Sequence, residues 1–260
     1  MILHAIESGE GPPVILLHGL FGSASNFGTV QRALAARFRV IALDLRNHGA
    51  SGHAATMDYE SMAADIVETL DRRNAAPAAL VGHSMGGKAA MMVALLHPQS
   101  LSRLAVGDIA PVPYQHRNAE IASAMLALRL VPGLTRAAAD TTLAGSVPEP
   151  GVRGFLLQNM IFGRGPAWRI GLAEIAASMP QIEGWPARHH AAYTGPALFI
   201  AGANSDYIVP GHRRAIRALF PAAQIVRLKN AGHWLHADNP AGFVAVLEAF
   251  LTDRSDHDRT

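Results

Sequence analysis

The stretch Ala78-Ala79-Leu80-Val81-Gly82-His83-Ser84-Met85-Gly86-Gly87-Lys88 decides the fold. An apolar run typical of a buried strand leads into it, and small and apolar residues that favour a helix follow as far as Leu96. A serine at so sharp a strand-to-helix turn exposes its hydroxyl, and the free N–H groups of the helix N-terminus point toward it. Side chains at Gly82 or Gly86 would clash across the turn. The pattern predicts a nucleophilic serine at position 84.

Other short apolar runs have the same character and end at glycine or polar residues. They are Val14–Leu17, Arg39–Leu43, Leu104–Val106, Ala197–Ala201 and Gln224–Leu228. Such runs without alternation are typical of parallel strands that are buried on both faces. Helical patterns lie between them, and we expect Asn26, Asp58 and Asn239 to be N-caps. The alternation predicts an α/β fold with a doubly wound, mostly parallel sheet.

The alternation of strands and helices fails between residues 111 and 195. This segment has helical apolar spacing throughout, and proline and glycine divide it into short pieces. We therefore predict one core domain made of residues 1–110 and 196–260, with residues 111–195 inserted as a helical cap over one end of the sheet. The polar residues after Thr252 are expected to form a frayed tail.

Composition excludes several classes of protein. Of the 260 residues, 50% are hydrophobic and 16% are charged, and Lys+Arg exceed Asp+Glu only by 22 to 20. With no basic run, the chain has no electrostatic footprint for nucleic acid. It has no cysteine, no H-E-x-x-H spacing among its 13 histidines, and no apolar run long enough to span a membrane. The N-terminus reads as a strand and not as a signal peptide. We expect a soluble, cytoplasmic protein without metal or membrane span; the sequence assigns no oligomeric state.

A serine hydroxyl becomes a nucleophile only when a base takes its proton. His233, at the end of the last predicted strand, is the candidate base. Either Asp108 or Asp206 would orient the imidazole, because both follow predicted strands and both give the order Ser, Asp, His. The oxyanion formed on the substrate needs two backbone N–H donors. We expect the N–H of Met85 and that of Leu20, with Phe21 as the alternative to Leu20.

These motifs resemble those of the YbfF-type bacterial esterases of the α/β-hydrolase superfamily. The resemblance spans residues 14 to 251 and is weakest in the insertion. It is carried by His18–Ser23, Asp44–Ser51, Gly82–Lys88, Asp108–Val112 and Gly232–Trp234. It implies a serine esterase or thioesterase with a helical cap and no cofactor. Because that branch shares the Asp-Ile-Ala-Pro-Val segment, the resemblance favours Asp108 as the acid. The superfamily usually places the acid where this chain has Ser205, which is a departure.

The sequence therefore predicts a hydrolase of carboxylic esters or acyl thioesters with short-to-medium apolar acyl groups. The alternatives are carbon–carbon bond hydrolysis, acyl transfer or perhydrolysis on the same triad, and a binding protein that does not turn over. Its partner is expected to be a small-molecule ester or thioester. Apolar side chains in excess of what a small cap can bury suggest a pocket formed by Phe21, Met125, Phe162 and Trp234. We expect His18 to support the oxyanion loop, and Arg46, Asn47 and His48 to hold a turn.

Overall fold

The computed structural model describes residues 1–186 and 192–253. Its main sheet has the strand order β1-β3-β2-β4-β5-β8-β9. The strands are β1 (Ala5–Ser8), β2 (Pro13–Leu17), β3 (Arg39–Leu43), β4 (Ala78–His83), β5 (Leu101–Gly107), β8 (Ala197–Gly202) and β9 (Gln224–Leu228). Only β1 is antiparallel to its neighbour, and every other pair in this sheet is parallel. The predicted strand runs all lie within these strands, and the predicted tail beyond residue 253 lies outside the described residues.

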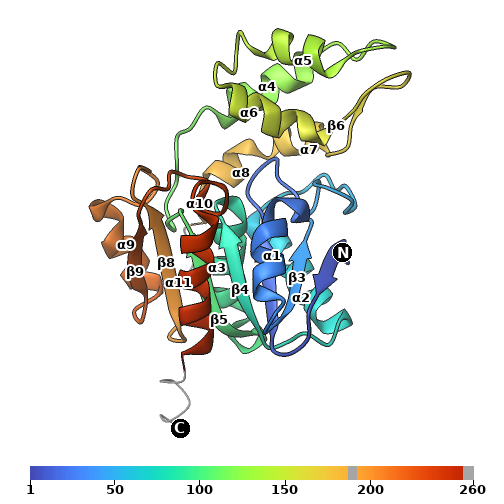
Figure 1. Ribbon diagram of the computed structural model, residues 1–260. Helices are drawn as coiled ribbons and strands as arrows, with labels where there is room; N and C mark the ends of the chain where they lie inside the picture. The colour runs from blue at the N-terminus through green and yellow to red at the C-terminus, as the bar shows by residue number, and fades with distance from the viewer. Residues whose placement is uncertain (187–191, 254–260) are drawn as a thin grey trace.

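Helices cover both faces of the sheet (Figure 1). They are α1 (Gly28–Leu34), α2 (Tyr59–Arg72), α3 (Met85–Leu96), α9 (Arg213–Leu219), α10 (Leu235–Asp238) and α11 (Pro240–Thr252), with short 3-10 turns at Ala24–Phe27, Pro98–Ser100 and Pro210–His212. Side chains alternate along β2, so that Ile15 and Leu17 join the core formed with α2 and α3. Val14 and Leu16 join a second core under α1 and α11. The sheet is thus buried on both faces, as its continuous apolar runs require.

Two of the three predicted helix caps are present. The Asp58 carboxylate accepts the N–H of Ser61 at 2.7 Å at the start of α2, and Asn239 accepts that of Gly242 at 3.0 Å at the start of α11. The prediction for Asn26 is wrong. A 3-10 turn occupies Ala24–Phe27, and the Asn26 side chain accepts the N–H of Ser23 at 2.7 Å instead of starting α1. A side chain that bonds backward in this way closes a local turn.

The segment between β5 and β8 lies over the end of the sheet at which the parallel strands finish (Figure 1). It contains α4 (Asn118–Ala127), α5 (Arg136–Leu143), α6 (Pro150–Leu156), the 3-10 turn Leu157–Asn159, α7 (Leu172–Ala177) and α8 (Met179–Glu183). It also contains a two-stranded antiparallel ribbon, β6 (Met160–Ile161) with β7 (Ala167–Trp168), which the helical spacing did not indicate. We call this segment the cap; its division from the core at 110/111 and 195/196 stays a prediction. Over the described ranges, each helix is too short or too polar to cross a bilayer.

Candidate active site

Ser84 lies at the turn between β4 and α3 with a strained backbone, at φ 52° and ψ −120°. The glycines on either side are required by space. A Cβ on Gly86 would come within 2.3 Å of the Leu17 carbonyl oxygen, and one on Gly82 within 2.2 Å of the Gly86 oxygen. Positive φ at a non-glycine residue costs free energy and persists where the surrounding structure imposes it. The turn therefore holds the Ser84 hydroxyl at the carboxyl end of β4.

Three side chains from separate strand ends form one hydrogen-bonded chain. The Oγ of Ser84 lies 3.1 Å from Nε2 of His233, which is in the loop after β9. The Nδ1 of the same imidazole lies 2.9 Å from Oδ2 of Asp108, which follows β5. With Nδ1–H donating to the carboxylate, Nε2 is free to accept the serine proton. This arrangement is competent for nucleophilic catalysis.

The Asp108 carboxylate is buried and fully engaged. Its Oδ1 accepts the N–H of Gly202 at 2.9 Å, and its Oδ2 accepts the Ser205 hydroxyl in addition to His233. Both extra donors come from β8 or the loop after it. A buried carboxylate is stable only when donors replace its lost water, and these bonds supply such donors to Asp108.

Asp206, the alternative acid, does not fit the structure. Its side chain is exposed, and it has no hydrogen bond to His233 among the described residues. Ser205 precedes it and takes the inward position, where its hydroxyl donates to Asp108. The departure from the superfamily pattern at Ser205 thus has a structural reason. The loop after β8 supplies a hydroxyl donor to the Asp108 carboxylate, which follows β5.

The loop after β2 contains the backbone N–H of Leu20, the predicted oxyanion donor. The carbonyl of Gly19 accepts from Nδ1–H of His18 at 2.8 Å and from the N–H of Gly22 at 3.0 Å. Because a trans peptide directs its C=O and N–H in opposite directions, the N–H of Leu20 points away from both donors. No hydrogen bond is recorded within the described part of the chain for this N–H or for that of Met85. The alternative donor Phe21 does not fit, since its N–H is bonded to Nε2 of His48 at 3.0 Å.

Two histidines near His233, the buried His83 and the half-buried His236, are held uncharged. Nε2–H of His83 donates to the His233 carbonyl at 2.7 Å, and its ring lies 4.8 Å from the His233 ring. Burial, reinforced by the nearby His233, holds the pKa of His83 well below its usual range. Burial likewise lowers the pKa of His236 to about 4. A second positive charge is therefore kept away from an imidazole that must accept a proton.

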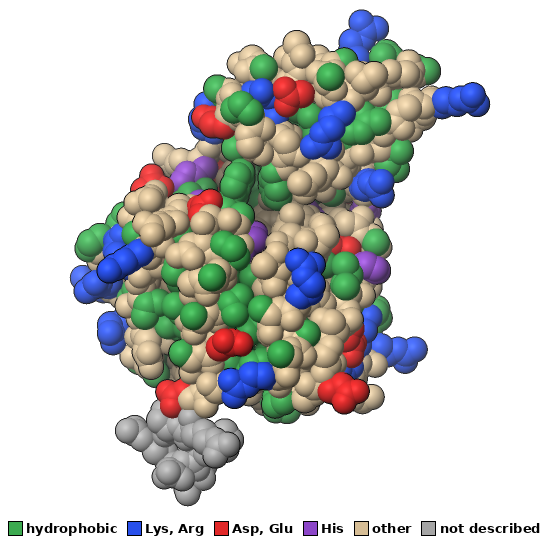
Figure 2. Space-filling view, in the orientation of Figure 1, with side chains coloured by type: hydrophobic (Ala, Val, Ile, Leu, Met, Phe, Trp, Pro, Cys, Tyr) green, Lys and Arg blue, Asp and Glu red, His purple; other side chains and the backbone are tan. Residues whose placement is uncertain are grey.

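A cavity of about 620 Å³ opens between the cap and the core over Ser84. Figure 2 shows the molecule hollowed at this level, with hydrophobic side chains along the hollow. Of the four predicted pocket residues, Phe21 and Trp234 line the cavity. Met125 and Phe162 do not: Met125 is fully buried in the main core, and Phe162 packs on a small cluster inside the cap. Helical spacing identifies an apolar face, but it does not say which neighbour that face meets.

Further aromatic residues of the cavity wall, among them Phe155 and Tyr207, are not among the four pocket residues that the sequence predicted. Phe155 of α6 lies against Trp234, with ring centroids 5.6 Å apart. Tyr207 lies on the His233 ring, with centroids 3.6 Å apart and planes 18° apart. Tyr207 follows the Ser205-Asp206 pair, and its position one residue past the candidate acid was the available signal.

As for metals, within residues 1–186 and 192–253 no three His, Asp or Glu side chains gather in a way that would hold an ion.

The fold and the geometry at Ser84 define a class of protein, and comparison with known proteins agrees. Residues 14–246 match the family model described as the alpha/beta hydrolase family, and the chain belongs to this family. It is 43% identical to the sn-1-specific diacylglycerol lipase ABHD11 of Mus musculus, over 92% of this chain and 81% of that one. It is 38% identical to Esterase YbfF of Escherichia coli strain K12, over 93% of each chain. A solved structure described as a marine microorganism esterase superposes with a TM-score of 0.92 at 34% identity, covering 96% of this chain and 99% of that one.

Proposed function

We propose that this protein is a serine hydrolase that cleaves carboxylic esters through an acyl-enzyme on Ser84. The single observation that carries the proposal is the unbroken hydrogen-bonded chain from Ser84 through His233 to Asp108. Three groups from distant parts of the sequence meet in the order and orientation that acyl transfer requires. The similarity to proteins named as esterases and a lipase supports the same reaction class.

In the first half of the reaction, the Ser84 oxygen forms a bond to the substrate carbonyl carbon while Nε2 of His233 takes its proton. The carbonyl π bond opens, and its electron pair becomes the oxyanion, which accepts from the N–H groups of Leu20 and Met85. When the oxyanion collapses, the ester C–O bond breaks and the imidazolium donates its proton to the leaving alkoxide. Asp108 stabilises the imidazolium throughout. Water then repeats these steps on the acyl-enzyme and releases the acid.

The cavity supports substrates with short-to-medium apolar acyl groups. Its volume of about 620 Å³ lies in the range of small-molecule sites, and aromatic and aliphatic side chains from the cap and the core line it. Oxygen esters and acyl thioesters both fit this chemistry, because each presents a carbonyl to Ser84. Glyceride esters are included, given the name of the mouse relative. A cytoplasmic location remains part of the proposal.

Active-site labelling combined with a substrate panel tests this function. A fluorophosphonate probe should label the wild-type protein at Ser84 and leave Ser84→Ala unlabelled. The wild type should hydrolyse p-nitrophenyl esters, acyl-CoA thioesters or glycerides of graded chain length, and Ser84→Ala should not. Adding an alcohol acceptor separates hydrolysis from acyl transfer, since a transferase would form the new ester in preference to the acid. Turnover that survives in a folded Ser84→Ala variant would place the nucleophile elsewhere.

A further inference from the structure

The loop that contains the Leu20 N–H turns at Phe21. Phe21 has φ 60°, a conformation that non-glycine residues hold only when their surroundings impose it. Both of its backbone polar groups have side-chain partners, one from the core and one from the cap. The position of the Leu20 N–H therefore depends on the hydrogen bonds that hold the backbone of Phe21.

On the core side, His48 accepts a hydrogen bond from the Phe21 N–H. The His48 ring is fully buried, and its Nδ1–H donates to the Arg46 carbonyl at 2.9 Å, so Nε2 is left as an acceptor. The Phe21 N–H donates to this Nε2 at 3.0 Å. Burial, with a further contribution from His18, lowers the pKa of His48 to about 3. The ring therefore remains a neutral acceptor across the working pH range.

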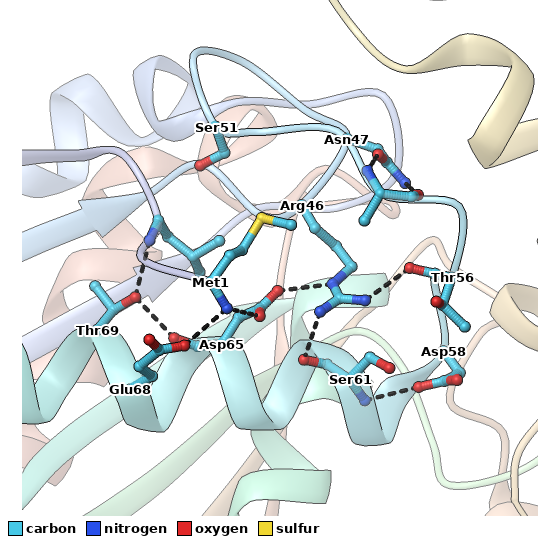
Figure 3. Close-up of polar contacts among 12 residues, drawn as sticks. Met1, Arg46, Asn47, Ser51, Thr56, Asp58, Ser61, Asp65, Glu68 and Thr69 are labelled. Atoms are coloured by element: carbon cyan, nitrogen blue, oxygen red, sulfur yellow. Dashed lines mark hydrogen bonds and ion pairs between the residues drawn. The ribbon is translucent and has the colours of Figure 1, made fainter.

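The loop that carries His48 is itself anchored (Figure 3). The Arg46 guanidinium donates to Asp65 of α2 at 2.7 Å, to the Thr56 carbonyl at 2.7 Å and to the Ser61 carbonyl at 3.2 Å. A planar guanidinium that is engaged by three acceptors leaves little freedom to the backbone it belongs to. His48, two residues further on, is thus a fixed point in the core.

On the cap side, Asn159 donates a hydrogen bond to the Phe21 carbonyl. Its Nδ2 donates to the Phe21 oxygen at 2.7 Å and to the Leu156 oxygen at 3.3 Å. Asn159 is 6% exposed, and its backbone carbonyl accepts the backbone N–H of Arg169 at 2.8 Å, which ties the residue to the end of the β6–β7 ribbon. The cap also donates to the anchored core loop through the Gly171 N–H.

We propose that His48 and Asn159 are positioning residues that hold Phe21 from the core and from the cap, and thereby aim the Leu20 N–H at the oxyanion. This inference rests on the proposed function. A buried carbonyl that loses its donor is costly, so without Asn159 the Phe21–Gly22 peptide relaxes. The N–H of this peptide holds the Gly19 carbonyl at 3.0 Å, and the Leu20 N–H shares the peptide of that carbonyl, so the Leu20 N–H turns with it. The oxyanion hole is then complete only while the cap is docked, which confines the chemistry to the closed, covered site.

Asn159→Asp is the sharpest test, because it keeps the shape of the side chain and removes the N–H donor. Gln181→Glu is the matched control, since it makes the same amide-to-carboxylate change on an exposed cap residue. With p-nitrophenyl butyrate, we expect kcat of Asn159→Asp to fall about 10- to 100-fold while KM stays within about threefold. Gln181→Glu should match the wild type in both constants.

Inhibitor binding separates positioning from general damage. A trifluoromethyl ketone, whose adduct with Ser84 places an oxyanion in the hole, should bind Asn159→Asp more weakly by the same factor as the loss in kcat/KM. Butyrate, the product acid, should bind with unchanged affinity. His48→Gln, which retains an acceptor oxygen, should lose less activity than His48→Leu, and thermal melting of each variant checks that it is folded.

The outcomes distinguish this inference from the function on which it rests. If the wild type shows neither Ser84 labelling nor ester turnover, the proposed function itself fails. If the wild type passes both and folded Asn159→Asp keeps its kcat and its affinity for the ketone within twofold, only the positioning role fails. A rise in KM with unchanged kcat would also overturn it, because it would make Asn159 a ground-state binding residue.

Discussion

The phenol ring of Tyr207 lies flat on the imidazole of His233, with ring centroids 3.6 Å apart and planes inclined by 18°. The Tyr207 ring also stacks on that of His116, with ring centroids 4.4 Å apart. Its backbone N–H donates to the Ser205 hydroxyl at 3.2 Å, and that hydroxyl in turn donates to Asp108. One short loop after β8 therefore supports both the imidazole and its carboxylate partner.

Removal of the Tyr207 ring should slow catalysis, because an aromatic face stabilises the imidazolium formed in the transition state and fixes the plane of the ring. We expect Tyr207→Leu to reduce kcat about two- to tenfold, and Tyr207→Phe, which keeps the ring, to stay within twofold. Steady-state hydrolysis of p-nitrophenyl butyrate measures both. If the leucine and phenylalanine variants have equal activity, the stacking has no catalytic role.

The choice of acid is tested by two matched substitutions. Asp108→Asn removes the negative charge beside Nδ1 of His233 and favours the wrong tautomer, so kcat should fall about 10³- to 10⁴-fold. Asp206→Asn changes an exposed side chain and should stay within twofold. Single-turnover acylation of each variant gives the comparison. Equal losses in the two variants would contradict the assignment of Asp108.

Ser205 should contribute to catalysis only through its hydrogen bond to Asp108. Ser205→Ala removes one of the three donors to the Asp108 carboxylate and leaves Gly202 and His233 in place. A charge-assisted hydrogen bond of this kind contributes about 1.5–3 kcal/mol, so we expect kcat to fall about 10- to 100-fold. Ser102→Ala, at an exposed position on β5, is the control. The combination with Asp108→Asn should be strongly non-additive, and simple multiplication of the two effects would argue against a shared pathway.

The strand-end residues were predictable because their chemistry is local. Ser84 needs only a strand, a sharp turn and a helix, and each of these leaves a mark in the sequence. The choice between Asp108 and Asp206 was not local, since it depends on which carboxylate points inward once β5 and β8 lie side by side. In the structure the Ser205 side chain turns toward Asp108 and Asp206 is exposed, and no spacing rule predicts that difference.

The cap was the least predictable part, for a related reason. Its helices were visible as apolar spacing, but Met125 faces the main core and Phe162 a small cluster within the cap, and neither reaches the cavity. The β6–β7 ribbon pairs only Met160 with Trp168 and Ile161 with Ala167, which is too short for a period of two to be recognised. The contact of Asn159 with Phe21 joins residues 138 positions apart, so it follows from the docking of the cap and not from any local pattern.

Lys88 gives the final prediction, which concerns stability and pH. Its side chain is fully buried, its Nζ donates to the Glu183 and Gly184 carbonyls at 3.2 and 2.6 Å, and burial lowers its pKa to about 7. The ordinary value is 10.5, so between pH 7 and 10.5 the unfolded chain binds more protons than the folded one. The free energy of unfolding should therefore rise with pH in this window, by up to about 1.4 kcal/mol per pH unit. Urea titrations at pH 7.5 and 9 should detect a rise of about 1–2 kcal/mol in the wild type that is absent in Lys88→Met. Lys229→Met, which alters the other lysine of the chain at an exposed site, should keep the rise. The same pH dependence in all three proteins would mean that the buried lysine is not its source.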